Sequence, residues 1–188
     1  MPHPFGQAGL NRKNYRQLRK EKTGYKKMKR VSAERHIVLV HPEIPWNTGC
    51  VGRSCLGVGA TLHLVEPLGF SLSAKEVKRA GLDYWPRVSL KVWPDFASFM
   101  DYMKPVQEEL LFFSKTASRT FREITPLDRM ILVFGSESKG LPPDILASFT
   151  GQHVHIPIHD SIRSLNLSTA VGIGLFESLR GRDPGHGW

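Results

Sequence analysis

FGSESKGLP, at residues 134–142, and IPIHDSIRSLNLS, at residues 156–168, are the two most informative segments of the chain. Each begins as an apolar strand and runs into a loop of small, hydrogen-bonding residues. Two such loops, close together in sequence, can surround a ligand with backbone amides and carbonyls. We therefore expect a cofactor pocket that is built mostly from main chain.

The rest of the chain alternates between short apolar runs and helix-like segments. Strands are predicted at 36–41, 61–65, 110–113, 130–134 and 153–156, with a weaker candidate at 88–92. Helices are predicted at 47–58, 74–80, 94–103, 143–149 and 165–180. Continuous apolar runs are typical of strands buried on both faces. Their alternation with helices predicts an α/β fold with a mainly parallel sheet.

The positive charge of the chain is confined to its first residues. Residues 1–36 carry eleven Lys or Arg against two Glu, and the rest of the chain is balanced, so the whole net charge of +9 lies there. We predict a basic, flexible or partly helical arm over residues 1–35, followed by one domain over residues 36–188. Such an arm indicates a polyanionic partner, most simply nucleic acid, with Lys26 and Lys27 as RNA contacts.

Two other interpretations of the arm stay open. It is a solvated tail, or it is a targeting peptide that directs the protein to an organelle. Transit peptides favour Arg and Ser, whereas this arm is rich in Lys and holds a single Ser, Ser32. We expect a cytoplasmic protein, because the chain has only two cysteines, Cys50 and Cys55, and no apolar run long enough to span a membrane.

Several familiar sites are disfavoured by the motifs. The spacing from Gly135 to Gly140 suits a phosphate loop, but Leu141 follows where that loop needs Lys. No G-x-G-x-x-G fingerprint and no G-x-S-x-G elbow is present. Cys50 and Cys55 lack a matching Cys or His pair, so we expect no metal and interpret both as small buried hydrophobic residues.

Three segments together resemble the motifs of the SPOUT superfamily of RNA methyltransferases. They are PEIPWNTGCVGR at 42–53, FGSESKGLP at 134–142 and IPIHDSIRSLNLSTAVGIGLFE at 156–177. EPLGF at 66–70 and RAGLDY at 79–84 fit between them. The resemblance covers about residues 36–180 and is strongest to the TrmL (YibK-like) group, which consists of tRNA 2′-O-methyltransferases that act on the wobble cytidine or uridine.

The resemblance implies a homodimer with a C-terminal trefoil knot that holds S-adenosylmethionine. Aligning the motifs places the cofactor contacts on Phe113, Gly135, Ile156, Ser164, Leu165 and Asn166. It also implies that each active site combines the cofactor loops of one subunit with Arg53 of the other. The reaction is attack of a ribose 2′-oxygen on the sulfonium methyl group.

From its place in the predicted helix, Arg53 is either a snorkelling surface residue or a phosphate ligand near the site. The resemblance implies that it is the catalytic residue. A guanidinium stays protonated in proteins, so we expect it to bind a phosphate and stabilise alkoxide charge instead of acting as a base. Asn47 is either the N-cap of its helix or an RNA contact, and Arg163 is either a second RNA contact or a solvated loop residue. We expect Glu137 to orient an arginine or a backbone amide.

Two departures from the family pattern concern the substrate. The chain has Phe176 in the last helix where the small wobble enzymes usually have Tyr, and the minimal bacterial members lack the basic arm. Alternative functions are therefore 2′-O-methylation of rRNA or of another tRNA position, or RNA binding without catalysis. The residues of that last helix also predict a buried stripe at Leu167, Val171, Leu175 and Leu179, and close packing at Gly172 and Gly174.

Overall fold

The protein is described by a computed structural model that covers residues 33–72 and 83–181. The predicted helix at 74–80 and almost all of the predicted arm, including Lys26 and Lys27, lie outside the described residues. The strands are β1 (Glu34–Val40), β2 (Thr61–Val65), β3 (Leu90–Trp93), β4 (Leu110–Phe113), β5 (Arg129–Phe134) and β6 (His153–Val154). The α-helices are α2 (Pro45–Val58), α4 (Phe96–Met103), α5 (Pro143–Ser148) and α6 (Leu167–Ser178). Short 3₁₀ turns are η1 (Trp85–Arg87), η2 (Gln107–Glu109), η3 (Phe121–Glu123) and η4 (Thr150–Gln152).

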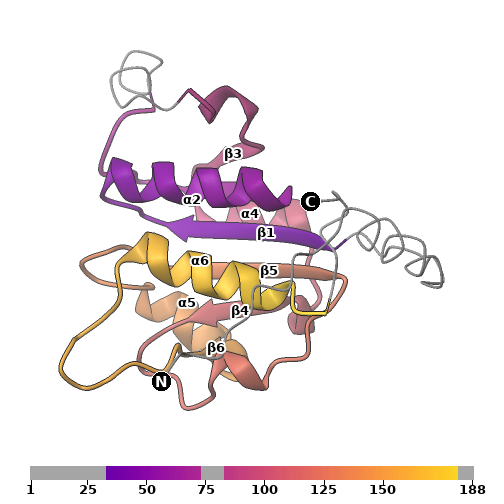
Figure 1. The fold of residues 1–188 in the computed structure, drawn as a ribbon, viewed down its shortest axis with the longest axis vertical. Coiled ribbons are helices and arrows are strands. Elements are labelled where there is room, and N and C mark those ends of the chain that lie inside the picture. The colour runs from indigo at the N-terminus through magenta and orange to yellow at the C-terminus, as the bar shows by residue number, and fades with distance from the viewer. Residues whose placement is uncertain (1–32, 73–82, 182–188) are drawn as a thin grey trace, which may run out of the picture. The chain divides into compact units, whose positions relative to one another are not determined.

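The six strands form one parallel sheet in the order β3-β2-β1-β5-β4-β6. Helices α2 and α6 cover one face, and α4 and α5 cover the other (Figure 1). This arrangement confirms the predicted α/β class with a mainly parallel sheet. The trefoil knot stays a prediction.

Alternation along the buried strands divides the core into two layers. Ile37 and Leu39 face α2 and α6, whereas Val38 and Val40 face α4 and α5. The same alternation holds in β5, and every one of these positions is fully buried or nearly so. Because both faces of the sheet are covered, the strands read as continuous apolar runs in the sequence.

Some element boundaries differ from the predicted ones for identifiable reasons. Helix α2 begins at Pro45 with Ile44 as its N-cap, so the prediction that Asn47 caps the helix is wrong. Proline suits this first helical position because its missing N–H has no helical partner there. Strand β6 ends at Val154, where β4 also ends, and His155 bonds instead with Arg119 and Phe121 of the preceding loop.

Strand β1 begins two residues earlier than predicted and includes the buried cation Arg35, which is 2% exposed. Its guanidinium donates to the carbonyls of Glu34, Asp128 and Ser178, and to the hydroxyl of Ser178. Carbonyls at the C-terminal end of a helix carry partial negative charge, so a cation is favoured beside Ser178. Arg35 thereby fastens the end of α6 to the start of β1.

Helix α6 packs against the sheet through the predicted stripe, of which Val171, Leu175 and Leu179 are buried and Leu167 is half-buried. Gly174 permits close packing as predicted, because an added Cβ would lie 2.8 Å from the Phe113 ring. Gly172 faces open space within the described part of the chain. Cys55 is buried as predicted, but Cys50 is exposed on the outer side of α2.

Within residues 33–72 and 83–181, no helix combines the length and the apolar composition that a membrane span requires. The same residues contain no group of three or more His, Cys, Asp and Glu side chains arranged to hold a metal ion.

A hydrogen-bonded line of polar side chains lies in the layer beneath α4. Trp93 Nε1 donates to His63 Nδ1 over 3.0 Å, and His63 Nε2 lies 2.9 Å from His36 Nδ1. His36 Nε2 lies 2.7 Å from Glu34 Oε1. Since Trp93 can only donate, a neutral His63 carries its proton on Nε2, and His36 then donates to Glu34.

Burial favours the neutral form of both histidines. Burial, with smaller contributions from nearby His36 and Lys91, lowers the pKa of His63 from its usual 6.5 to about 3. Burial also lowers the pKa of His36, although Glu34 opposes that shift, and Arg129 and Lys91 add to it. At pH values below the ordinary histidine pKa, the unfolded chain binds more protons than the folded chain does.

The free energy of unfolding is therefore expected to fall as pH drops below about 6.5. For His63 alone, the loss between about pH 7.5 and pH 5 is roughly 2 kcal/mol. Urea unfolding of the wild type and of His63→Phe at both pH values measures it, with exposed His159→Ala as the control. An equal pH dependence in the wild type and His63→Phe would contradict this expectation.

Candidate functional site

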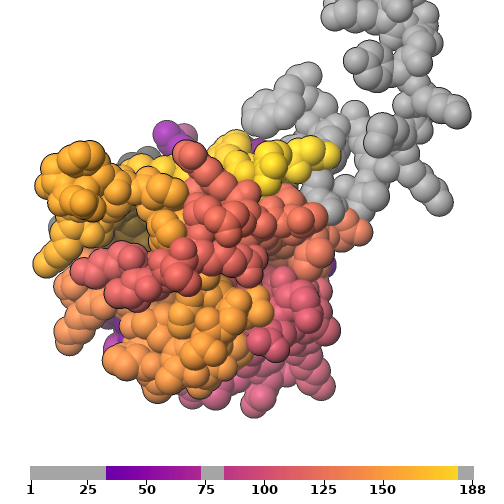
Figure 2. Space-filling view, turned by 90° about the horizontal axis from the view of Figure 1, so that it is seen from below, coloured from indigo at the N-terminus to yellow at the C-terminus, as the bar shows by residue number. Residues whose placement is uncertain are grey.

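A cavity of about 520 Å³ lies beyond the carboxyl ends of β4, β5 and β6. Its walls come from the loops after these strands and from the start of α6. In Figure 2 the surface is hollowed between the orange segment that follows β6 and the salmon segment that follows β4. Ligands in parallel sheets generally bind at this edge, and the volume suits a nucleoside-sized molecule.

The structure brings all six predicted cofactor residues to this one cavity. Its lining includes Phe113, Gly135, Ile156, Ser164, Leu165 and Asn166. Apolar side chains such as Phe113, Leu141 and Ile156 form part of the wall, and main chain from the two loops forms much of the rest. A flat, partly apolar ligand with polar edges fits this composition.

The loop after β5 requires glycine at positions 135 and 140, where its two ends come into close contact. Ser136 N donates to Gly140 O over 3.1 Å, and Gly140 N donates to Ser136 O over 3.0 Å. A Cβ on Gly135 would lie 2.0 Å from the carbonyl carbon of Gly140, closer than any real contact. Gly140 has a φ of 73°, in the left-handed region that glycine adopts without strain.

A line of hydrogen bonds joins the three predicted motifs beside the cavity. Asn166 Nδ2 donates to Asn47 Oδ1 over 2.9 Å, and Asn47 Nδ2 donates to Glu137 Oε1 over 2.9 Å. Asn166 also caps α6, because its Oδ1 accepts from the amides of Ser168 and Thr169. Asn47 is only 7% exposed, and both of its polar side-chain atoms are bonded within the chain.

Two carboxylates lock the loop before α2 to the loop after β5. Glu137 accepts from the backbone amides of Glu43 and Ile44, at 2.8 and 3.2 Å. In return, Glu43 accepts from the amide and the hydroxyl of Ser138, at 3.1 and 2.6 Å. Glu137 therefore orients backbone amides, one of the two roles expected from the sequence.

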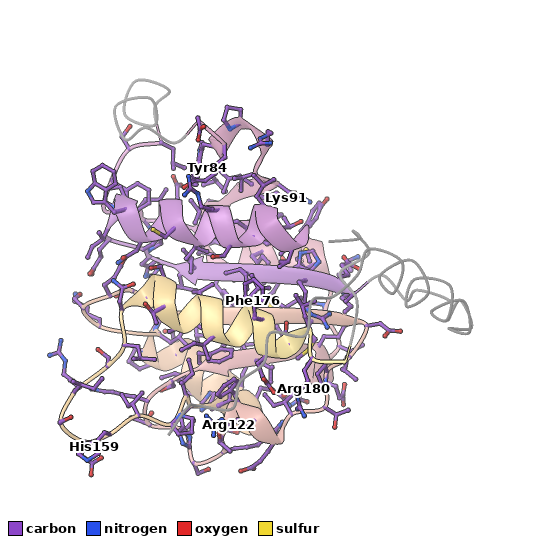
Figure 3. All side chains as sticks on the ribbon, viewed as in Figure 1. Tyr84, Lys91, Arg122, His159, Phe176 and Arg180 are labelled. Atoms are coloured by element: carbon purple, nitrogen blue, oxygen red, sulfur yellow. The ribbon has the colours of Figure 1, made fainter. Side chains whose placement is uncertain are left out.

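The predicted cations lie at two different places. Arg163 lines the cavity, together with Lys115 and Lys139. Arg53 does not line it; this residue is exposed on the outer side of α2, where its Cζ lies 4.5 Å from the centre of the Tyr84 ring. His159 lies at the outer end of its loop and is exposed (Figure 3).

Sequence reasoning missed several parts of this site. The loop after β4, with Ser114, Lys115 and Thr116, lines the cavity. Its signal was the end of a buried strand at Phe113, since loops after neighbouring parallel strands meet at one edge. Glu43 and Tyr84 lie within the quoted motifs, but no local pattern assigns them partners that are distant in sequence.

The cavity and the exposed cation Arg53 lie at two different places in the chain. The cavity lining includes apolar side chains, small loop residues and the cations Lys115, Lys139 and Arg163. The carboxylates of Glu43 and Glu137 are hydrogen-bonded within the chain. The exposed guanidinium of Arg53 is available to an anion. Such a site can bind two substrates and stabilise negative charge, while the reactive electrophile comes from the ligand.

Comparison with known proteins agrees with this geometry. The profile of the SpoU rRNA Methylase family matches residues 34–176. The chain is 42% identical to the tRNA (cytidine(34)-2'-O)-methyltransferase of Burkholderia cenocepacia, over 77% of this chain and 94% of that protein.

Solved structures extend the comparison. One that concerns the 2-OH methylation of C/U34 on tRNA is 41% identical, with a TM-score of 0.73 over 80% of this chain and 99% of that chain. An AdoMet-bound rRNA methyltransferase from Sinorhizobium meliloti is 26% identical, with a TM-score of 0.70 over 80% of this chain and 57% of that chain.

Gly135→Ala is expected to destroy the cavity, because the new methyl group would occupy the position of the Gly140 main chain. Isothermal calorimetry with S-adenosylmethionine is expected to lose its binding heat, with affinity reduced by about 100-fold or more. The control is Gly151→Ala, where an added Cβ meets only the end of the Gln107 side chain at 3.9 Å. Unchanged affinity in a folded Gly135→Ala protein would contradict the assigned cavity.

Proposed function

The chain belongs to the SpoU rRNA methylase family, and from this membership we propose that it transfers a methyl group from S-adenosylmethionine to a ribose 2′-hydroxyl of tRNA. The proposed target is nucleotide 34, as cytidine or uridine, because that position appears in the names of relatives about 40% identical to this chain. The observation that carries the proposal is the convergence of three motif loops on one cavity.

The cavity residues fit S-adenosylmethionine. Gly135 allows the loop after β5 to fold closely on itself at the cavity wall, and the cavity volume of about 520 Å³ is ample for a nucleoside with an amino-acid tail. Phe113, Gly135, Ile156, Ser164, Leu165 and Asn166 would hold it. When bound, this cofactor supplies an electrophilic methyl group on a sulfonium.

Arg53 supplies the positive charge that the reaction needs on the RNA side. When bound, the cofactor would supply the methyl group that the ribose 2′-oxygen accepts, with the hydroxyl proton lost to solvent. Negative charge would grow on that oxygen as the proton leaves. The guanidinium of Arg53 binds the adjacent phosphate and stabilises this charge, and alignment of the two substrates supplies much of the remaining acceleration.

The active site is completed by a second copy of the chain. Arg53 lies outside the cavity, on an exposed side of α2 that also carries Trp46, which is 61% exposed. Neighbouring α6 exposes Ile173 and Phe176 on the same face of the sheet (Figure 3). Exposed apolar side chains gathered on two adjacent helices mark an interface. We assign this face to a homodimer in which Arg53 reaches the cavity of the partner.

The remaining RNA contacts follow from charge and burial. Arg163 at the cavity is assigned to the RNA backbone, as are Lys26 and Lys27 of the basic arm, residues 1–35. The domain over residues 36–188 then carries the chemistry. Asn47 is assigned a different role from the expected RNA contact: it holds the loops together, because its side chain is buried and bonded. A cytoplasmic location agrees with two free cysteines and with a tRNA substrate.

Incubating the protein with tritiated S-adenosylmethionine and tRNA from a strain without wobble 2′-O-methylation is expected to label nucleotide 34. Nuclease digestion and mass spectrometry identify the methylated nucleotide. Arg53→Ala is expected to reduce turnover by about 100-fold or more while it keeps cofactor affinity.

The same assay separates the alternatives. Label in rRNA or at another tRNA position would replace the proposed target, and RNA binding without any transfer would favour a non-catalytic role. Repeating it on a chain without residues 1–32 tests the arm, whose loss is expected to weaken RNA binding and flatten its salt dependence.

Mixed dimers test the shared active site. Arg53→Ala and Gly135→Ala homodimers are both expected to be inactive. A heterodimer of the two variants keeps one intact site, made from the loops of the first chain and Arg53 of the second, so activity is expected to return. Co-expression with two affinity tags isolates this species. An inactive heterodimer would show that each chain builds its site alone.

A further inference from the structure

Arg53 is held by an aromatic ring instead of a carboxylate. Its Cζ lies over the Tyr84 ring, 4.5 Å from the centroid, which is within the range of a cation–π contact. In the described part of the chain, no carboxylate forms an ion pair with Arg53. A carboxylate would neutralise the charge of the guanidinium, whereas an uncharged aromatic ring leaves that charge in place.

Contacts of Tyr84 and of the neighbouring Trp85 hold this segment against α2. The residue is 5% exposed, and its hydroxyl donates to the carbonyl of Gly49 over 2.8 Å. Gly49 lies one helical turn before Arg53. The neighbouring Trp85 ring packs at Gly52, where an added Cβ would lie 2.6 Å from it. These contacts leave the Tyr84 ring little freedom to swing away from α2.

The ring also stays uncharged. Burial raises the pKa of Tyr84, and the positive charge of Arg53 together with a side-chain hydrogen bond to Arg53 opposes only part of that shift. A neutral phenol does not neutralise the charge of Arg53. Figure 3 shows Tyr84 beside α2, in the segment that leads into η1.

We propose that Tyr84 is a positioning residue whose ring holds the Arg53 guanidinium in place without neutralising it, so that its charge stays available to the anionic substrate. This inference rests on the proposed function, which assigns Arg53 to the RNA phosphate and the developing alkoxide. An unsupported arginine on an exposed helix samples many rotamers, and ordering it costs free energy at each turnover. A ring that holds it beforehand reduces that cost.

Three variants test the ring. Tyr84→Leu removes the aromatic face, Tyr84→Phe keeps the face but loses the bond to Gly49, and Tyr102→Leu removes the comparable Lys91–Tyr102 contact on α4, on the opposite face of the sheet. With saturating S-adenosylmethionine, Tyr84→Leu is expected to lower kcat for tRNA by about 5- to 30-fold. KM for S-adenosylmethionine stays unchanged, Tyr84→Phe restores kcat to within about twofold, and Tyr102→Leu matches the wild type.

A second measurement does not depend on activity. In ¹⁵N-labelled protein, the Nε–H resonance of Arg53 is expected to show a ring-current shift that Tyr84→Phe keeps and Tyr84→Leu loses. Tyr84→Met, which fills more of the ring volume, replaces Tyr84→Leu if the latter unfolds in thermal denaturation.

The outcomes separate this inference from the proposed function. A wild type without methyl transfer would overturn the proposed function and with it the role of Tyr84. An active wild type with an equally active, folded Tyr84→Leu would overturn the role of Tyr84 alone. A Tyr84→Phe protein as slow as Tyr84→Leu would do the same, because it would assign the effect to the hydroxyl.

Discussion

A short line of hydrogen bonds, from Asn166 through Asn47 to Glu137, is the constraint on which the candidate site depends. It joins residues that are 119 and 90 positions apart in the sequence. Leu141 and Ile156 of these loops pack against the two apolar layers, and side-chain hydrogen bonds join the loops to one another. Asn47 uses polar atoms on both sides, and losing it would remove a hydrogen bond from each of its neighbours in a partly buried place.

The two halves of the site use different physical means. The cavity depends on close main-chain packing, in which Gly135 and Gly140 give the loop after β5 a path that larger residues would block. The exposed cation on α2 is Arg53, whose Cζ lies 4.5 Å from the centre of the Tyr84 ring.

The sheet supports this separation because it is rigid and fully covered. Strands β1 and β5 are central and buried on both faces, so the loops that leave their carboxyl ends start from defined positions. Arg35 fastens the far end of α6 to β1, and Asn166 caps its near end. Helix α6 is thus held at both ends, which fixes the wall of the cavity and the outer face that carries Phe176.

Much of the fold and part of the candidate site could be predicted from local sequence patterns. The strands at 61–65 and 110–113 have the predicted bounds, and the loop residues Gly135 and Asn166 line the cavity as expected. Apolar periodicity and glycine spacing are properties of neighbouring residues, so the sequence by itself determined the class of fold and the segments that line the cavity. Only the tertiary structure decided which distant side chains pair: Arg35 with Ser178, Asn47 with Glu137, and Arg53 with Tyr84. These pairs form because the fold brings distant segments of the chain side by side, and no local pattern encodes a contact across so many residues.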